Sequence, residues 1–162
     1  MEIHGILQTS VEFYGIIFVR AVPQCLEHAK NEEDKDYDFY AVFADNDAEW
    51  VWYVLLPKLE SELGYKGYIS ERDSIGGQFK VDNINNAIRK SVCVIFVITP
   101  DFFKDRLCNY CLHQSAMTSP IIPIVKEKCT GCDLSSLESI QIVEFYRHGD
   151  WQQVVNTLQN VM

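Results

Sequence analysis

The chain has few basic residues. Over 162 residues, 14 Lys and Arg stand against 23 Asp and Glu, which leaves a formal net charge of −9 at pH 7. Nucleic acids and anionic membrane surfaces both recruit clustered Lys and Arg, so this balance argues against either as a partner. A protein with a basic or otherwise complementary face fits the charge better.

The sequence also lacks a long hydrophobic run. Residues 11–22 are the most apolar stretch near the start, but Glu12 and Arg20 interrupt them, and they fall short of the roughly 20 residues that cross a bilayer. The start has neither the basic residues nor the small-residue cleavage site of a secretory leader. We expect a soluble, cytosolic chain in which the six cysteines are mostly reduced.

Common catalytic patterns are missing as well. The pair Gly76-Gly77 has no Lys-Ser or Lys-Thr after it, which argues against a phosphate-binding loop. The four histidines are scattered and form no Ser/His/Asp set, and we expect His113 and His148 to be polar surface residues. What remains is an ordinary globular composition, 48% apolar, on a chain long enough for one domain with a substantial core.

Segments rich in β-branched and aromatic residues alternate with segments of helical periodicity. Strands are expected at residues 37–43, 65–70, 92–98, 121–125 and 140–146, and helices at 50–63, 81–88, 102–112 and 151–162. The unbroken apolar run 92–98 indicates a strand that is covered on both faces. The alternation predicts an α/β fold, a flavodoxin-like doubly wound parallel sheet of five strands in the order 2-1-3-4-5 with helices on both faces.

Two prolines shape these expectations. Pro57 is predicted to kink the first helix, which ends at Gly64, and Glu60 on that helix is predicted to be solvated. Pro123 weakens the fourth strand and so predicts that it is not central in the sheet.

An acidic segment, residues 31–36, reads as a solvated linker. We therefore place a domain boundary there, with residues 1–36 as a separate segment and residues 37–162 as the folded domain.

A polar loop with two glycines, residues 71–79, joins the second strand to the second helix. Most of this loop is not needed for a core, and loops held on a rigid α/β scaffold often carry function. Phe79 is the exception, because we expect it to begin the buried face of the helix together with Val81 and Ile84.

Three short motifs, in order and at suitable spacing, make residues 37–162 resemble a Toll/interleukin-1 receptor (TIR) domain. The first-box likeness begins with Tyr37-Asp38, the second is Arg72-Asp73-Ser74-Ile75-Gly76-Gly77, and the third is at Trp151. Gly76 stands where the second box of the family has proline, and Asp150 replaces the usual phenylalanine before Trp151.

Within the family, the chain is most similar to the cytoplasmic domain of an animal Toll-like receptor, with the interleukin-1 receptor branch close behind. The resemblance implies a signalling module of innate immunity that binds TIR-containing adaptors and other copies of itself, without a cofactor. It also implies that residues 1–36 include a juxtamembrane-like segment on the cytoplasmic side of a membrane receptor.

The resemblance further implies that residues 72–77 contact the partner. Arg72 and Asp73 are expected to form charge pairs that select the partner, and Ile75 is expected to be an apolar anchor. Gly76 should loosen the loop because it removes the fixed φ of proline.

Some TIR domains cleave NAD and use a glutamate in the third helix. Cys111 stands at the corresponding position here, and a thiol does not supply the charge of a carboxylate. We therefore expect no NAD glycohydrolase activity, with an NAD-cleaving enzyme as the alternative function.

Four cysteines form a C-x2-C-x17-C-x2-C pattern. They are Cys108, Cys111, Cys129 and Cys132. This spacing is compatible with a four-thiolate zinc site, a disulfide or free thiols, and neighbouring strands would bring both pairs to one end of the sheet. A zinc- or redox-sensing domain is thus a second alternative.

Overall fold

The computed structural model describes residues 34–132 and 134–162. The chain divides into two compact units, Met1–Asp34 and Lys35–Met162, and the described residues belong almost wholly to the second. The expected juxtamembrane-like segment therefore lies mostly outside the described residues. Within them, no helix is both long and apolar enough to cross a membrane.

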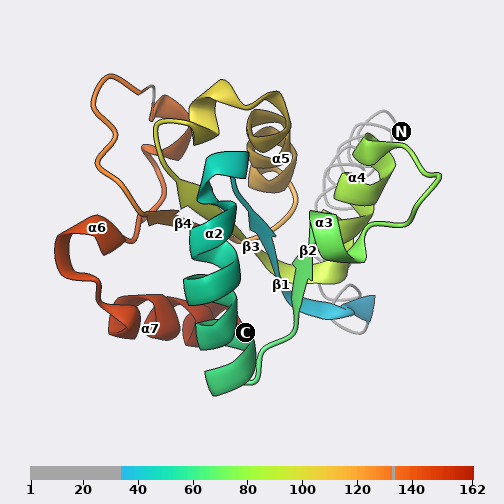
Figure 1. The fold of residues 1–162 in the computed structure, drawn as a ribbon, viewed down its shortest axis with the longest axis horizontal. Coiled ribbons are helices and arrows are strands. Elements are labelled where there is room, and N and C mark those ends of the chain that lie inside the picture. The colour runs from blue at the N-terminus through green and yellow to red at the C-terminus, as the bar shows by residue number, and fades with distance from the viewer. Residues whose placement is uncertain (1–33, 133) are drawn as a thin grey trace, which may run out of the picture. The chain divides into compact units, whose positions relative to one another are not determined.

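The sheet has four parallel strands in the order β2-β1-β3-β4 (Figure 1). They are β1 (Tyr37–Val42), β2 (Gly67–Ile69), β3 (Ser91–Ile98) and β4 (Ile121–Val125). β1 and β3 are central, and β3 pairs with β1 on one side and with β4 on the other. The predicted α/β class, the parallel sheet and the order of the first four strands are confirmed.

The expected fifth strand is reduced to one bridge, in which Val143 pairs with Ile124. The amide of Val143 donates to the carbonyl of Pro123, and the amide of Val125 donates to the carbonyl of Val143, each at 2.8 Å. Alternate residues of a strand point their amides to the same side, so Pro123 faces this edge without an N–H group. The ladder therefore cannot extend backward from Val143, and the chain enters helix α6 (Phe145–His148) directly after it.

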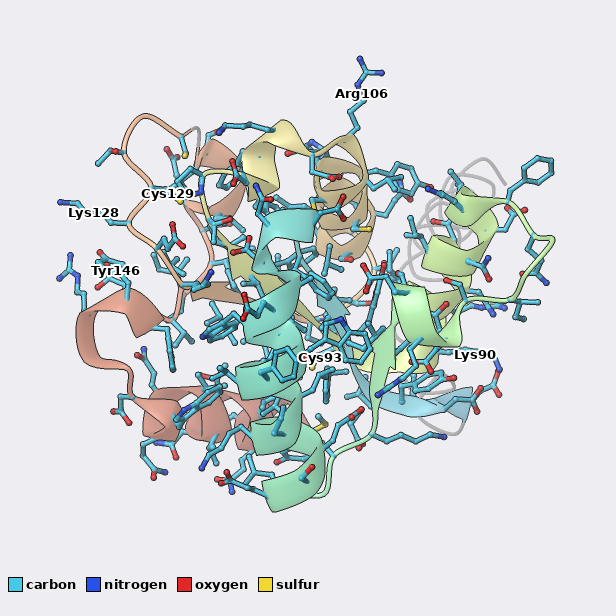
Figure 2. All side chains as sticks on the ribbon, viewed as in Figure 1. Lys90, Cys93, Arg106, Lys128, Cys129 and Tyr146 are labelled. Atoms are coloured by element: carbon cyan, nitrogen blue, oxygen red, sulfur yellow. The ribbon has the colours of Figure 1, made fainter. Side chains whose placement is uncertain are left out.

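Helices cover both faces of the sheet (Figures 1 and 2). They are α2 (Ala48–Trp50), α3 (Ser70–Asp73), α4 (Lys80–Lys90), α5 (Arg106–Ala116), α6 and α7 (Trp151–Val161). One face carries Phe39 and Ala41 against α7 and the helix that contains α2. The other face carries Tyr40 and Val42 against α4 and α5. The alternation along β1 thus builds two hydrophobic cores, as expected for a strand buried on both sides.

The first long helix is not a regular α-helix. After α2 it continues as π-helical turns over Val51–Leu55 and Pro57–Glu62. The amide of Leu56 donates to the carbonyl of Val51, five residues back. Pro57 has no amide to donate, so the wider turn accommodates the proline without a broken helix. Gly64 follows with φ +76°, which confirms the predicted end.

Two expectations around the second-box motif are wrong. Residues 70–73 form the short helix α3, so the loop begins at Ser74 and not at Glu71. Phe79 is 81% exposed and Val81 is 43% exposed. Phe79 has extended backbone angles and precedes the first turn of α4, so its side chain does not follow the helical period.

Gly67 offers a test of the packing between β1 and β2. A Cβ at this position would lie 2.3 Å from the buried Phe39 ring, whereas a Cβ at Gly76 would meet no atom within 4 Å. We predict that Gly67→Ala lowers the free energy of unfolding by about 1–3 kcal/mol. Gly76→Ala is the matched control, with a change within about 0.5 kcal/mol. Urea unfolding measures both, and equal effects would contradict this packing.

Candidate functional site

The three family-like motifs do not meet at one site. The Tyr37 ring lies 5.2 Å from the Tyr68 ring, edge to face, with Lys66 Nζ 4.9 Å from the Tyr37 ring centre. Asp38 accepts a hydrogen bond from the Lys66 amide at 2.6 Å. Tyr37 and Asp38 therefore secure β1 to the chain entering β2, and have a structural role.

Trp151 lies in an aromatic cluster at the start of α7. Its ring stacks on Trp50 at 6.3 Å and meets Phe145 at 4.9 Å. Asp150 caps α7 by accepting a hydrogen bond from the Gln152 amide at 2.7 Å. The aspartate thus satisfies a free amide at the helix start, while Trp151 packs against the core on the face opposite α4 and α5.

Arg72 is bound within its own domain. Its guanidinium makes two 3.0 Å contacts with the Glu60 carboxylate and donates to the Gly67 carbonyl at 2.7 Å. Its Nε also contacts the Asp73 carboxylate at 3.0 Å. These carboxylates raise the pKa of Arg72 further above its usual value. Such two-point geometry joins the 48–62 helix, β2 and α3.

Glu60 is a residue that the sequence analysis placed wrongly. Instead of being solvated, it binds Arg72 and also accepts a hydrogen bond from the Gly67 amide at 3.2 Å. The two partners are 12 positions apart on different elements. No local periodicity connects them, so no sequence signal could have found the pair.

Asp73 and Ser74 are also engaged internally. Asp73 accepts a hydrogen bond from the Ile69 amide at 2.8 Å, across the short helix α3. The Ser74 hydroxyl lies 3.2 Å from the Tyr68 hydroxyl. The polar half of the second-box motif therefore holds the fold together, and its charges are largely used before any partner arrives.

Asn83 holds the rest of the loop. This buried side chain accepts a hydrogen bond from the Ile75 amide and donates to the Ile75 carbonyl, each at 3.1 Å. Both backbone polar groups of Ile75 are thus satisfied by one residue of α4. The result is a fixed backbone that leaves the Ile75 side chain 54% exposed.

We define residues 75–79 as the apolar loop. Ile75 and Phe79 provide exposed hydrophobic side chains, and Gly77 has φ +83°, which favours glycine. Val81 lies close by at the start of α4. Exposed apolar side chains on an anchored backbone are the usual basis of a protein contact.

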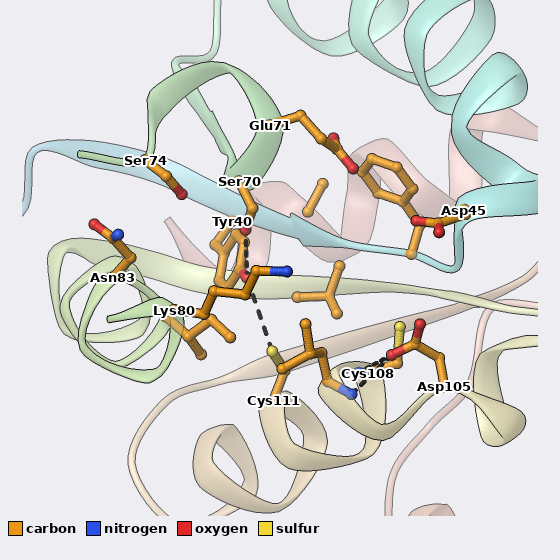
Figure 3. Close-up of a pocket in the computed structure, with 15 residues that line it drawn as sticks. Tyr40, Asp45, Ser70, Glu71, Ser74, Lys80, Asn83, Asp105, Cys108 and Cys111 are labelled. Carbon is orange, nitrogen blue, oxygen red and sulfur yellow. Dashed lines mark hydrogen bonds between the residues drawn. The ribbon is translucent and has the colours of Figure 1, made fainter. Parts of the chain in front are cut away.

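A cavity of about 380 Å³ opens at the carboxyl ends of β1 and β2 (Figure 3). Its lining includes the carboxylates of Asp45, Glu71 and Asp105, together with Lys80 and buried side chains of β1, α4 and α5. Figure 3 shows the Lys80 side chain reaching across this space. Burial raises the pKa of the Glu71 carboxyl above its usual value.

Cys111 lies in the wall of this cavity as a neutral thiol. Its sulfur is 3.8 Å from the Tyr40 hydroxyl, which in turn lies 2.9 Å from the Ser70 hydroxyl. Burial raises the pKa of Cys111 to about 11 and the pKa of Tyr40 well above its ordinary value. Both groups are uncharged at neutral pH, so neither supplies the negative charge of a carboxylate there.

The four cysteines do not gather into one ligand set. Cys108 and Cys111 are buried in α5, while Cys129 and Cys132 lie on the segment after β4 and are partly exposed. Across residues 34–132 and 134–162, no group of three or more His, Cys, Asp or Glu side chains is placed to hold a metal ion. A tetrahedral zinc site needs four converging ligands, which this arrangement does not provide.

The two-point contact of Asn83 predicts different results for two substitutions. Asn83→Asp keeps an oxygen that accepts from the Ile75 amide, whereas Asn83→Leu removes both hydrogen bonds. We expect Asn83→Leu to lower the free energy of unfolding by about 1–3 kcal/mol and to abolish hydrogen-exchange protection of the Ile75 amide. Protection that survives in Asn83→Leu would show that Asn83 does not hold the loop.

Comparison with known proteins agrees with this geometry. The family model described as the TIR domain matches residues 39–159. Mouse Toll-like receptor 3 is 33% identical over 99 residues, which cover 61% of this chain and 11% of the receptor. Dog Toll-like receptor 2 is 32% identical over 109 residues, which cover 64% of this chain and 14% of the receptor. The match thus spans only a small part of these relatives.

A solved structure shows the same similarity. The crystal structure of the TIR domain of the Toll-related receptor TRR-2 from Hydra magnipapillata superposes with a TM-score of 0.69 at 30% identity. The alignment covers 76% of this chain and 99% of that domain. The family match over most of the sequence and this whole-domain superposition lead to one conclusion. The chain belongs to the TIR domain family and is related to the signalling domains of animal Toll-like receptors.

Proposed function

We propose that this chain is a non-catalytic signalling module that works by binding other TIR domains, both copies of itself and TIR-containing adaptors. The observation that carries the proposal is the apolar loop, with Ile75 54% exposed and Phe79 81% exposed on an anchored backbone. Large apolar side chains are costly to leave in water, and burying them against a partner recovers that free energy.

The contact differs from the one expected from charge alone. Arg72 and Asp73 already bind Glu60, Gly67 and Ile69, so they position the loop and leave the contact to its apolar residues. The formal net charge of −9 favours a partner with a basic rim around this apolar centre. Ser74, Gly76 and Gly77 complete the proposed partner-binding segment.

The proposed module acts on the cytoplasmic side of a membrane receptor in innate immune signalling. The support is the similarity to Toll-like receptors 2 and 3, of which the matched residues are a minor part. A domain of this size that only binds partners needs no cofactor, since its output is assembly.

The absence of NAD cleavage is supported by Cys111. A carboxylate in the third helix is the group that the NAD-cleaving branch uses, and the position here holds a buried neutral thiol. Glu71 is the carboxylate that keeps the enzymatic alternative open, because it lines the same cavity and its burial resembles that of a catalytic acid.

The apolar loop predicts the effect of two charge substitutions on self-association. We expect Ile75→Asp and Phe79→Asp each to raise the dissociation constant at least about tenfold, because an interface anchor contributes more than about 1.4 kcal/mol. Sedimentation equilibrium of the full chain over a range of concentrations measures this. Thermal unfolding of each variant should match the parent protein, since both side chains are exposed.

Met117→Asp is the matched control. Met117 is 84% exposed at the end of α5, so it is as apolar and as accessible as Phe79 but lies outside the loop. It should leave self-association unchanged. Equal weakening by Met117→Asp, or no effect of the loop substitutions, would refute the proposed surface.

The thiol at position 111 predicts no release of nicotinamide from NAD. Concentrated full chain is incubated with NAD beside an active TIR enzyme, and free nicotinamide is followed by chromatography. We expect release indistinguishable from buffer. Release that Glu71→Gln or Cys111→Ser removes would overturn the non-catalytic proposal and would identify the group responsible.

A further inference from the structure

The chain contains two Cys-x-x-Cys segments of equal spacing in opposite surroundings. Cys108 and Cys111 lie inside α5, with exposed fractions of 3% and 2%. Cys129 and Cys132 lie on the segment between β4 and residue 135, and both are partly exposed. Figure 2 shows Cys129 on this outer segment beside Lys128. The second pair takes no part in the proposed TIR contact.

The backbone brings the second pair together. The chain bends at Thr130 and Gly131, and Gly131 has φ +78°, a conformation that other residues rarely adopt. The Cys132 thiol forms a side-chain hydrogen bond with the Cys129 thiol. Two sulfur atoms at hydrogen-bond distance in a four-residue bend need only a small movement to form a covalent bond.

We propose that Cys129 and Cys132 form a thiol–disulfide exchange site that takes a low-molecular-weight disulfide such as glutathione disulfide. One cysteine thiolate attacks a sulfur of glutathione disulfide, forms a mixed disulfide and releases one glutathione. The other cysteine then attacks the mixed disulfide, closes the Cys129–Cys132 bond and releases the second glutathione. The protein loses two electrons and two protons, which the two glutathione thiols carry away.

Burial excludes the helical pair from this reaction. An external disulfide has to reach a sulfur atom in line with the breaking S–S bond, and the Cys108 and Cys111 sulfurs are covered by the core shared with α4. The Cys111 sulfur is also in contact with the Tyr40 hydroxyl. Spacing alone therefore does not decide reactivity, and access separates the two pairs.

The charges around the second pair affect the equilibrium more than the rate. Burial raises the pKa of Cys129 to about 12, with further contributions from Cys132, Glu127 and Asp47. Lys104 is the cation that faces Cys132. A dithiol whose thiolate form is disfavoured gains no stability from ionisation, in contrast to strongly oxidising pairs with low pKa values. Closure is therefore slow but leads to a stable disulfide.

The bond closes a short ring and acts locally. A loop of a few residues loses little chain entropy on closure, so the disulfide should change the unfolding temperature only slightly. Its effect is to fix the segment that follows Lys126, whose Nζ pairs with buried Asp47 at 2.8 Å.

Trypsin separates the two pairs within one sample. Cleavage after Arg106, Lys126, Lys128 and Arg147 gives peptide 107–126 with Cys108 and Cys111, and peptide 129–147 with Cys129 and Cys132. The reduced full chain is treated with glutathione disulfide under native conditions, free thiols are blocked with N-ethylmaleimide, and the digest is analysed by mass spectrometry. The helical pair is the internal control for equal spacing.

We expect peptide 129–147 to lose two hydrogens at least about tenfold faster than peptide 107–126, which stays reduced as long as the chain is folded. Cys129→Ser and Cys132→Ser should each stop at a stable mixed disulfide with glutathione. The proposal is overturned if peptide 129–147 remains a dithiol or carries only glutathione adducts. Equal oxidation of both peptides would also overturn it, because it would report thiols exposed by unfolding.

Discussion

The structure depends on the burial of β3 on both faces. Ser91–Ile98 is covered by helices on each side, and its backbone pairs with β1 and β4 in parallel. A strand without a solvent face requires neighbours whose connections cross over through helices, and this requirement sets the layered arrangement. The same arrangement places the ends of β1 and β2, the cavity and the second-box segment at one edge of the sheet.

At that edge the polar and apolar residues of one motif have separate roles. Arg72 and Asp73 satisfy groups on the 48–62 helix and β2, and Asn83 satisfies the backbone of Ile75. Because these partners are internal, the loop backbone is held without any contribution from a binding partner. The hydrophobic side chains are left as the groups with most to gain from a contact, which supports the proposal of a binding module.

The sulfur chemistry follows the same logic of access. Cys111 occupies the catalytic position of the enzymatic branch, yet its burial against Tyr40 keeps it neutral and covered. Cys129 and Cys132 have the same spacing as the helical pair, but a bend at Gly131 brings them together where a small disulfide can reach them. Position in the fold, and not residue type, distinguishes an inert thiol from an exchangeable one.

The sequence by itself determined the parts that depend on local pattern. The apolar run of β3, the end of the first helix at Gly64, the order of the first four strands and the thiol at position 111 could all be read from neighbouring residues. The resemblance also located the second-box motif, and Ile75 was correctly expected to offer an exposed apolar side chain.

Tertiary structure alone decided the rest. The pairing of Arg72 with Glu60, the outward direction of Phe79 and the loss of the fifth strand depend on contacts between elements. For the last of these, the side of β4 toward which Pro123 lacks an amide is known only once β3 occupies the other side. Sequence periodicity reports which face of an element is apolar, but hydrogen-bond partners far apart in the chain are set by packing, which one sequence does not reveal.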